Sequence, residues 1–275
     1  MFFKTMRTTL LLILSILLFT SCSEYQRVLK NDDTAKKYSM MNTMYENGKY
    51  KKALKLMEQI VPAYRGKPQA EKLMFMYANT FYNLEDFYLA GYQFERFATS
   101  YPKSDSVEIA SFKGAQSYYE LSSRFSLDQE ETYKGLEKLQ SFIDKYPDSE
   151  LRTDANAKVA ELNNKLEKKS IETAKQYLRI SDYKAAIESF DNFILDNPGS
   201  VYRKNAYFGK FEAAYRLAIN SFPSLVKDRL ITAKGYYNNF AKYYGDSDVK
   251  EDSDKLIEDV NKRLNEYKTE TSSLK

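Results

Sequence analysis

The chain contains no histidine, no tryptophan and a single cysteine, Cys22, in 275 residues. Without histidine it cannot build a histidine-dependent catalytic triad, and with one cysteine it has neither a His/Cys zinc site nor an internal disulfide. Neither of the glycine-rich phosphate-binding patterns, GxxxxGK[ST] or GxGxxG, occurs. These absences exclude most familiar catalytic and nucleotide-binding sites, and we expect no metal site.

Glycine and proline are also scarce, with 9 and 6 copies, and almost all lie at expected turns. This distribution favours an all-α fold over a sheet. The 24 tyrosines and 17 phenylalanines supply enough apolar surface for a core. A formal net charge of +4 with both signs mixed gives no single-sign field for nucleic acid, so we expect no nucleic-acid partner.

One sequence motif, called the aromatic phrase here, occurs four times, and it ends in Pro or Gly followed by Ser. Its spacings of three and four residues place the aromatic side chains on one helical face, while the Pro or Gly ends the helix and Ser can cap the next. The copies are Phe94, Phe97, Tyr101, Pro102, Ser104; Leu139, Phe142, Tyr146, Pro147, Ser149; Phe190, Phe193, Asn197, Pro198, Ser200; and Tyr237, Phe240, Tyr244, Gly245, Ser247. Met57, Ile60 and Tyr64 form a fainter first copy.

Each interval between these turns holds two helical patterns, which is typical of stacked helical hairpins. Small residues such as Ala78 and Ala90 in the second hairpin permit close helix packing, as in tetratricopeptide (TPR) repeats. The sequence therefore predicts an all-α, TPR-like α-solenoid of about five hairpins, roughly ten helices, with a long linking helix near 149–180. Surplus residues around Arg124–Glu131 and Ser221–Arg229 predict longer loops in the third and fifth hairpins.

The first residues have the order of a secretory signal peptide. Lys4 and Arg7 precede an apolar run from Leu10 to Phe19, which is too short for the roughly 20 residues of a membrane-spanning helix. The ending, Phe19-Thr20-Ser21-Cys22, resembles a bacterial lipoprotein signal, in which the chain is cleaved before the cysteine and the cysteine is acylated. We expect a lipid on Cys22; the alternative is a signal peptide with an incidental cysteine at its edge.

These patterns divide the chain into five parts. They are a signal peptide (1–21), a lipid-anchored tether (22–33), an N-terminal half with three hairpins (34–150), a C-terminal half with two hairpins (151–265) and a polar tail expected to fray (266–275).

Four stretches together resemble the BamD family of outer-membrane assembly lipoproteins, beyond a general TPR likeness. They are Leu127–Thr132, Leu139–Ser149, Leu162–Lys169 and Asp182–Ile187. The resemblance extends from Cys22 to about Tyr244.

The resemblance implies a non-enzymatic subunit, on the periplasmic face of the outer membrane, of the machinery that inserts β-barrel proteins. Its N-terminal repeats would receive unfolded barrel proteins, and its C-terminal repeats would dock on the periplasmic domains of the barrel-forming subunit BamA. Arg216, in an Ala214-Tyr215-Arg216 segment, is the docking candidate. Candidates for the substrate groove are Tyr45, Tyr77, Tyr82 and Tyr88. No cofactor is implied besides the lipid on Cys22.

Two other functions remain open on the sequence. A different TPR lipoprotein could act as a scaffold in cell division or capture glycans for an importer, although sugar capture commonly uses exposed tryptophan, which is absent here. The other possibility is an enzyme with a carboxylate pair, such as a glycosidase. Against it, the Asp and Glu residues are scattered along helices beside Lys.

Overall fold

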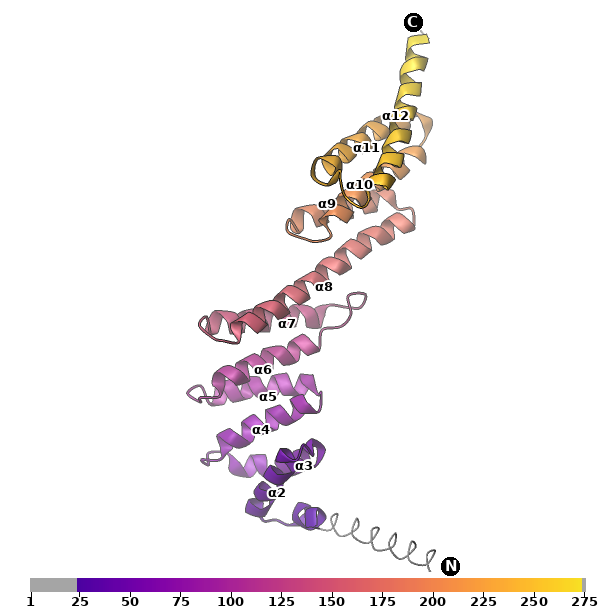
Figure 1. Ribbon diagram of the computed structural model, residues 1–275. Coiled ribbons are helices and arrows are strands. Elements are labelled where there is room, and N and C mark those ends of the chain that lie inside the picture. The colour runs from indigo at the N-terminus through magenta and orange to yellow at the C-terminus, as the bar shows by residue number, and fades with distance from the viewer. Residues whose placement is uncertain (1–23, 274–275) are drawn as a thin grey trace, which may run out of the picture. The chain divides into compact units, whose positions relative to one another are not determined.

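The computed structural model describes residues 24–273, and all regular structure in that range is helical, which confirms the predicted fold class (Figure 1). Residues 24–30 are helical. The following helices are α2 (Thr34–Glu46), α3 (Tyr50–Tyr64), α4 (Ala70–Asn83), α5 (Phe87–Ser100), α6 (Val107–Glu120), α7 (Glu130–Lys145), α8 (Arg152–Arg179), α9 (Tyr183–Asp196), α10 (Arg203–Ile219), α11 (Pro223–Tyr244) and α12 (Lys250–Ser273). The predicted long helix near 149–180 is α8.

The chain divides into two compact units. Unit 1 comprises the chain up to Ser123 together with Glu130–Val159, and unit 2 comprises Arg124–Gln129 together with the chain from Ala160 onward. The division falls inside α8, whereas the sequence suggested a boundary between residues 150 and 151. The loop that precedes α7 also belongs to unit 2 rather than to the N-terminal half.

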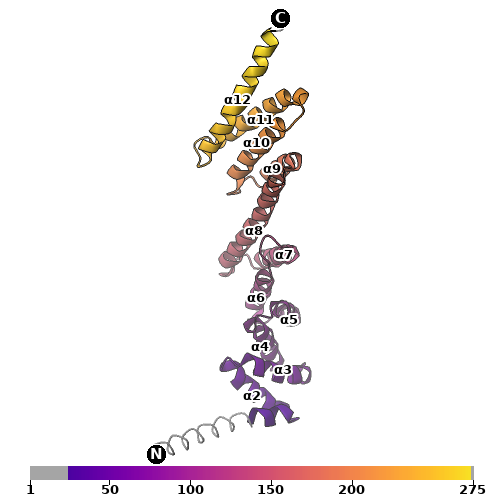
Figure 2. The ribbon, with the colours of Figure 1, turned by 90° about the vertical axis from the view of Figure 1, so that its right-hand side faces the viewer.

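Unit 1 is a series of helical hairpins. Helices α2 and α3, α4 and α5, and α6 and α7 pack pairwise, and α3 on α4 and α5 on α6 join successive pairs; both ribbon views show this order along the unit (Figures 1 and 2). Residues of the aromatic phrase form the core, where Phe94, Phe97 and Leu139 have no exposed surface. Small residues lie where helices meet, with Ala53, Ala78 and Ala90 fully buried.

Unit 2 is also built from packed helical pairs. Ile171 and Ala174 of α8 pack with Phe190 and Phe193 of α9 in one core cluster. Helices α10 and α11 form the next hairpin, and α12 packs on both of them through a second cluster that includes Val260.

The serine of the repeated phrase does not cap the next helix as expected. Instead, Ser104 Oγ accepts a hydrogen bond from the Ser106 N–H at 3.0 Å within the turn and donates to Glu71 Oε1 on α4 at 2.6 Å. Each such pair ties the turn after a hairpin's second helix to the first helix of that hairpin. The equivalent pairs are Ser149 with Glu108 at 2.5 Å and Ser200 with Glu167 at 2.7 Å.

One other prediction about local structure is wrong. Residues 221–229 do not form a long loop, because Pro223 occupies the first turn of α11 and the surplus residues lengthen that helix. Helix α12 extends to Ser273 and so includes most of the segment assigned to the polar tail. The predicted loop around residues 124–131 is present, between the end of α6 and the start of α7 at Glu130.

Candidate functional site: a polar row in unit 1 and a cavity in unit 2

Two of the four candidate tyrosines join a row of contacts across the first helices of three successive hairpins. Asn79 Nδ2 on α4 donates to Tyr45 Oη on α2 at 2.6 Å. Lys113 Nζ on α6 donates to Asn79 Oδ1 at 2.5 Å and lies 5.1 Å from the ring centre of Tyr82. We call Tyr45, Asn79, Tyr82 and Lys113 the polar row.

The charge in the polar row belongs to Lys113. Its ammonium group is half-buried, and this burial lowers the pKa of Lys113. Among the side chains that the structure describes, its polar partners are a neutral amide and an aromatic face, with no ion pair. Burial also raises the pKa of Tyr45 and that of Tyr82. The row therefore offers aromatic surface beside one positive charge that has no counter-ion among the described side chains.

The other two candidate tyrosines lie elsewhere. Tyr77 packs against the core clusters of the first and second hairpins and makes an edge contact with Phe81 at 4.9 Å between ring centres, so it helps to hold the hairpins together. Tyr88 on α5 is 59% exposed, and its ring lies 6.0 Å from Lys134 Nζ on α7. Neither is part of the polar row.

Sequence reasoning missed Asn79 and Lys113, although a signal was present. Tyr45 and Asn79 are 34 residues apart, and so are Asn79 and Lys113, which is the TPR repeat length. The three residues therefore occupy equivalent positions in successive repeats. A search for the same spacing among polar residues would have found the row.

Arg216 lies on α10 in unit 2 beside a cavity of about 480 Å³. Its side chain is 49% exposed and forms an ion pair with Glu212, with Nη2 and Oε1 2.7 Å apart. Lys175 and Arg179 from α8 line the same cavity, as does Phe208 of α10. The cavity therefore combines an apolar wall with a basic margin.

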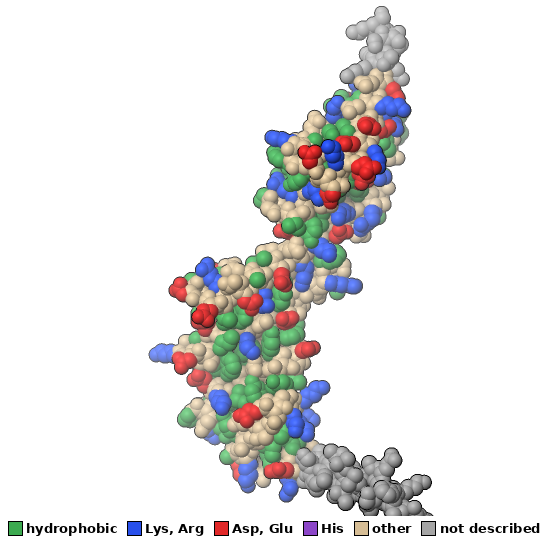
Figure 3. Space-filling view, in the orientation of Figure 1, with side chains coloured by type: hydrophobic (Ala, Val, Ile, Leu, Met, Phe, Trp, Pro, Cys, Tyr) green, Lys and Arg blue, Asp and Glu red, His purple; other side chains and the backbone are tan. Residues whose placement is uncertain are grey.

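The two carboxylates at this margin are shared among three cations. Glu172 lies 2.9 Å from Lys175 Nζ and 3.8 Å from Arg179 Nη1, while Glu212 forms an ion pair with Arg216. The margin thus keeps one net positive charge, suited to an acidic partner. Elsewhere the charges are mixed, and Figure 3 shows Lys and Arg interspersed with Asp and Glu on the face in view.

The loop before α7 is held by one buried glutamine. Gln129 is 4% exposed, and its Nε2 lies within hydrogen-bond distance of the backbone oxygens of Arg124, Leu127 and Asp128. Lys169 Nζ on α8 donates to the Leu127 oxygen at 2.7 Å. Residues 127–129 of the stretch that carried part of the family resemblance therefore lie in a fixed loop of unit 2, and its last three residues begin α7 in unit 1.

Cys22 lies outside the described residues, as does the whole predicted signal peptide. Within residues 24–273 no helix has both the length and the apolar character needed to cross a membrane. The described side chains also include no group of three or more carboxylates and other ligands placed to hold a metal ion.

Comparisons with known proteins identify relatives of this chain. Outer membrane protein assembly factor BamD of Rickettsia prowazekii is 26% identical over 182 residues, which cover 64% of this chain and 70% of that protein. The BamD protein of Caulobacter vibrioides is 29% identical over 126 residues, or 46% of this chain. That alignment spans only 41% of the Caulobacter protein.

Among solved structures, the TPR-like repeats of a putative kinesin light chain from Podosopora anserina align over 75% of this chain and 94% of that one. The identity is 13% and the TM-score 0.32, too low to support an argument. The family comparison is stronger, because the YfiO model, described as "Outer membrane lipoprotein", matches residues 30–228. The chain therefore belongs to the YfiO family of outer membrane lipoproteins, which agrees with its likeness to BamD proteins.

Proposed function

We propose that this protein is a non-catalytic, lipid-anchored subunit of the machinery that assembles β-barrel proteins in the outer membrane. Its family and the BamD names of its two relatives support this role. At the site, the proposal rests on the polar row, in which residues at equivalent positions of three hairpins are joined by hydrogen bonds. A surface that continues from repeat to repeat suits an extended chain.

The anchor in this proposal is a lipid on Cys22. Acyl chains contribute about 0.8 kcal/mol per buried CH₂, and more than one chain gives stable attachment. The mature chain then begins at Cys22 on the periplasmic face of the outer membrane and requires no other cofactor. The absence of histidine and of any second cysteine supports a binding role rather than a catalytic one.

The substrate in this proposal is an unfolded barrel segment held along the polar row. Strands of barrel proteins are rich in aromatic residues at their ends, and such side chains can pack on the rings of Tyr45 and Tyr82. Lys113 supplies a positive charge that a carboxylate of the segment can pair with. Because its ammonium group is half-buried, such a pair is screened less than one at the surface.

The partner of unit 2 in this proposal is BamA, through its periplasmic domains. The basic margin of the cavity, with Arg216 at its edge, offers charge for an acidic residue, and Phe208 offers an apolar contact beside it. Arginine is well suited to this purpose because its planar group can bind a carboxylate with two hydrogen bonds.

Co-purification tests both contacts. The protein is tagged at its C terminus, extracted from outer membranes in mild detergent, and its partners are identified by mass spectrometry. We expect a large barrel protein with periplasmic repeats, retained by wild type, weakened by Arg216→Ala and unaffected by Lys227→Ala, which removes an exposed cation of α11. Recovery of cell-division or glycan-uptake proteins in its place would contradict the proposal.

The polar row is tested separately by crosslinking to a newly made barrel protein. We expect Lys113→Met to reduce crosslinking while BamA is still recovered. Lys134→Met serves as the control, since Lys134 lies near Tyr88 outside the row. Equal crosslinking in wild type and Lys113→Met would rule out the row as the substrate site.

A further inference from the structure

The segment that the sequence assigned to a tether is partly a packed helix. Residues 24–30 are helical, and Tyr25 is 5% exposed within the core cluster of the first hairpin. Tyr25 Oη donates to the backbone oxygen of Lys52 on α3 at 3.1 Å, and Val28 and Leu29 pack against the same cluster. The chain is therefore attached to the first hairpin from Tyr25 onward.

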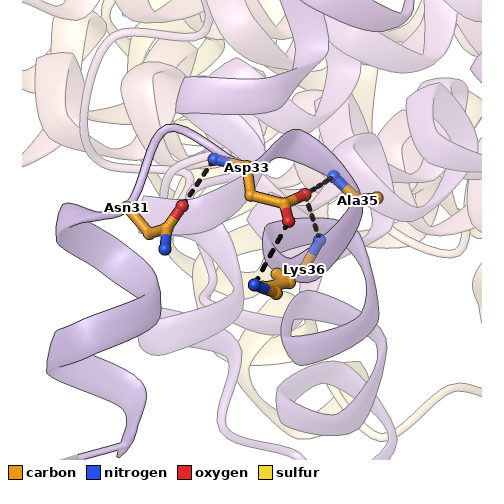
Figure 4. Close-up of polar contacts among 4 residues, drawn as sticks. All are labelled: Asn31, Asp33, Ala35 and Lys36. Carbon is orange, nitrogen blue, oxygen red and sulfur yellow. Dashed lines mark hydrogen bonds and ion pairs between the residues drawn. The ribbon is translucent and has the colours of Figure 1, made fainter.

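The turn between residues 24–30 and α2 is closed by polar contacts (Figure 4). Asn31 Oδ1 accepts a hydrogen bond from the Asp33 N–H at 2.8 Å. Asp33 Oδ1 accepts from the N–H groups of Ala35 and Lys36 at the start of α2, and its hydrogen bonds with these groups lower the pKa of Asp33. These contacts cap the N-terminus of α2 and fix the orientation of residues 24–30 relative to that helix.

The distance from the expected lipid to the packed core is consequently short. Cys22 and Tyr25 are separated by three residue steps, which span at most about 11 Å when extended. This is close to the Debye length of about 8 Å at physiological ionic strength. A lipid on Cys22 therefore holds the surface around Tyr25 within electrostatic reach of the headgroups.

That surface is basic. Lys49, Lys51, Lys52 and Lys55 are all exposed at the start of α3, and no ion pair involves them among the described side chains. Lys52 Nζ lies 5.2 Å from the ring centre of Tyr25, which places the group beside the anchor. Four cations so close together repel one another in the absence of an anionic partner.

We propose that Lys49, Lys51 and Lys55 contact anionic phospholipid headgroups of the leaflet that holds the Cys22 lipid, with Tyr25 as the positioning residue. The inference rests on the lipid attachment proposed above. Basic residues beside a membrane anchor are attracted to anionic headgroups, and one lipid signal is strengthened by a basic patch. The first hairpin then lies on the membrane in a fixed orientation rather than on a free tether.

Fluorescence quenching at the membrane surface tests this orientation. Since Cys22 is the only cysteine and is acylated in this account, an introduced cysteine provides a single labelling site. A dye is placed at Glu46→Cys, beside the lysines, or at Lys103→Cys, on the turn after α5. The full-length acylated protein is reconstituted in phosphatidylglycerol–phosphatidylcholine vesicles that carry a headgroup-linked quencher.

We expect quenching at position 46 but little at position 103. The reversal Lys49→Glu/Lys51→Glu/Lys55→Glu should remove most of the quenching at 46, and Tyr25→Ser should reduce it with the lysines intact. The matched reversal Lys72→Glu/Lys103→Glu/Lys145→Glu should leave it unchanged. Circular dichroism verifies that each variant is folded.

Equal quenching at position 46 in wild type and in the first reversal, or in vesicles with and without phosphatidylglycerol, would overturn the inference. Mass spectrometry of the N-terminal peptide separates this failure from failure of the proposed anchor. An acylated Cys22 without quenching overturns only the contact with headgroups. An unmodified Cys22 overturns both the anchor and the contact.

Discussion

Ser104, on the turn after α5, donates a 2.6 Å hydrogen bond to Glu71 on α4 and thereby closes its hairpin. The same pair closes the hairpins of Ser149 and Ser200. In the last hairpin the pair is replaced: Lys204 on α10 forms an ion pair with Asp248, and Ser247 Oγ is buried with no hydrogen-bond partner among the residues that the structure describes. The repeated serine thus contributes to closure between helices rather than to capping.

The serine–glutamate pair should be measurable as stability. Ser104→Ala removes a hydrogen bond to a charged group in a mostly buried position, and we expect a loss of about 1–3 kcal/mol in the free energy of unfolding. Urea denaturation followed by circular dichroism measures it. Ser106→Ala is the control, because the Ser106 side chain makes no capping hydrogen bond. Equal losses in the two variants would contradict this role.

Two glycines in unit 2 should respond in opposite ways to alanine. A Cβ at Gly209 would lie 2.4 Å from Cζ of Phe190, a ring with no exposed surface, so we expect Gly209→Ala to destabilise unit 2 by about 1–3 kcal/mol. A Cβ at Gly235, inside α11, would meet nothing within 4 Å. Gly235→Ala should therefore be neutral or stabilise by up to about 1 kcal/mol. Thermal unfolding distinguishes them, and a stable Gly209→Ala variant would show that the ring can move aside.

Much of this fold could be predicted from the sequence, because the aromatic phrase follows helical spacing and its members must share one face. Phe94, Phe97, Phe190 and Phe193 are all at most 1% exposed. The phrase also marks the ends of the hairpins, because Tyr or Asn followed by Pro recurs after the second helix of a hairpin.

The errors have physical causes. Surplus residues after Ser221 predict a loop, but Pro223 fits the first turn of a helix and lengthens α11. The burial of Tyr25 is not expected from its place in the short segment between the signal peptide and the first hairpin, although Val28 and Leu29 follow it at helical spacing. In the candidate site, Tyr45 and Tyr82 meet through Asn79 and Lys113, a contact between repeats that spacing within one helix does not show.

Alkaline pH should weaken unit 1 through Tyr118. Burial, with Glu95 nearby as a hydrogen-bond acceptor, raises the pKa of Tyr118 from 10.0 to about 12. The folded chain then keeps this proton where the unfolded chain loses it, so the contribution of Tyr118 is present below pH 10 and is lost as the pH rises toward 12.

Tyr118→Phe removes this titration. We expect the variant to lose less stability than wild type between pH 10 and pH 12, by on the order of 1 kcal/mol after solvent screening. Urea titrations at several pH values measure the difference. Tyr133→Phe, at a 62% exposed ring on α7, is the control. Parallel pH profiles for wild type and Tyr118→Phe would refute the assignment.

The loop before α7 should depend on the amide of Gln129. Gln129→Glu replaces a donor by a carboxylate that faces three backbone oxygens, so we expect unit 2 to lose about 1–3 kcal/mol of stability. Hydrogen exchange of the amides in residues 122–129 should become faster. Gln176→Glu, at an exposed position on α8, should change neither quantity. Unchanged exchange in Gln129→Glu would mean that the loop is held by other contacts.

The central claim is the role in outer-membrane assembly, and depletion tests it most directly. The protein is placed under a repressible promoter, and quantitative mass spectrometry follows isolated outer membranes as it disappears. The account predicts that β-barrel proteins as a class decline there while other lipoproteins stay constant, and that wild type but not a Cys22→Ser variant restores them. Unchanged barrel levels after full depletion would contradict the account.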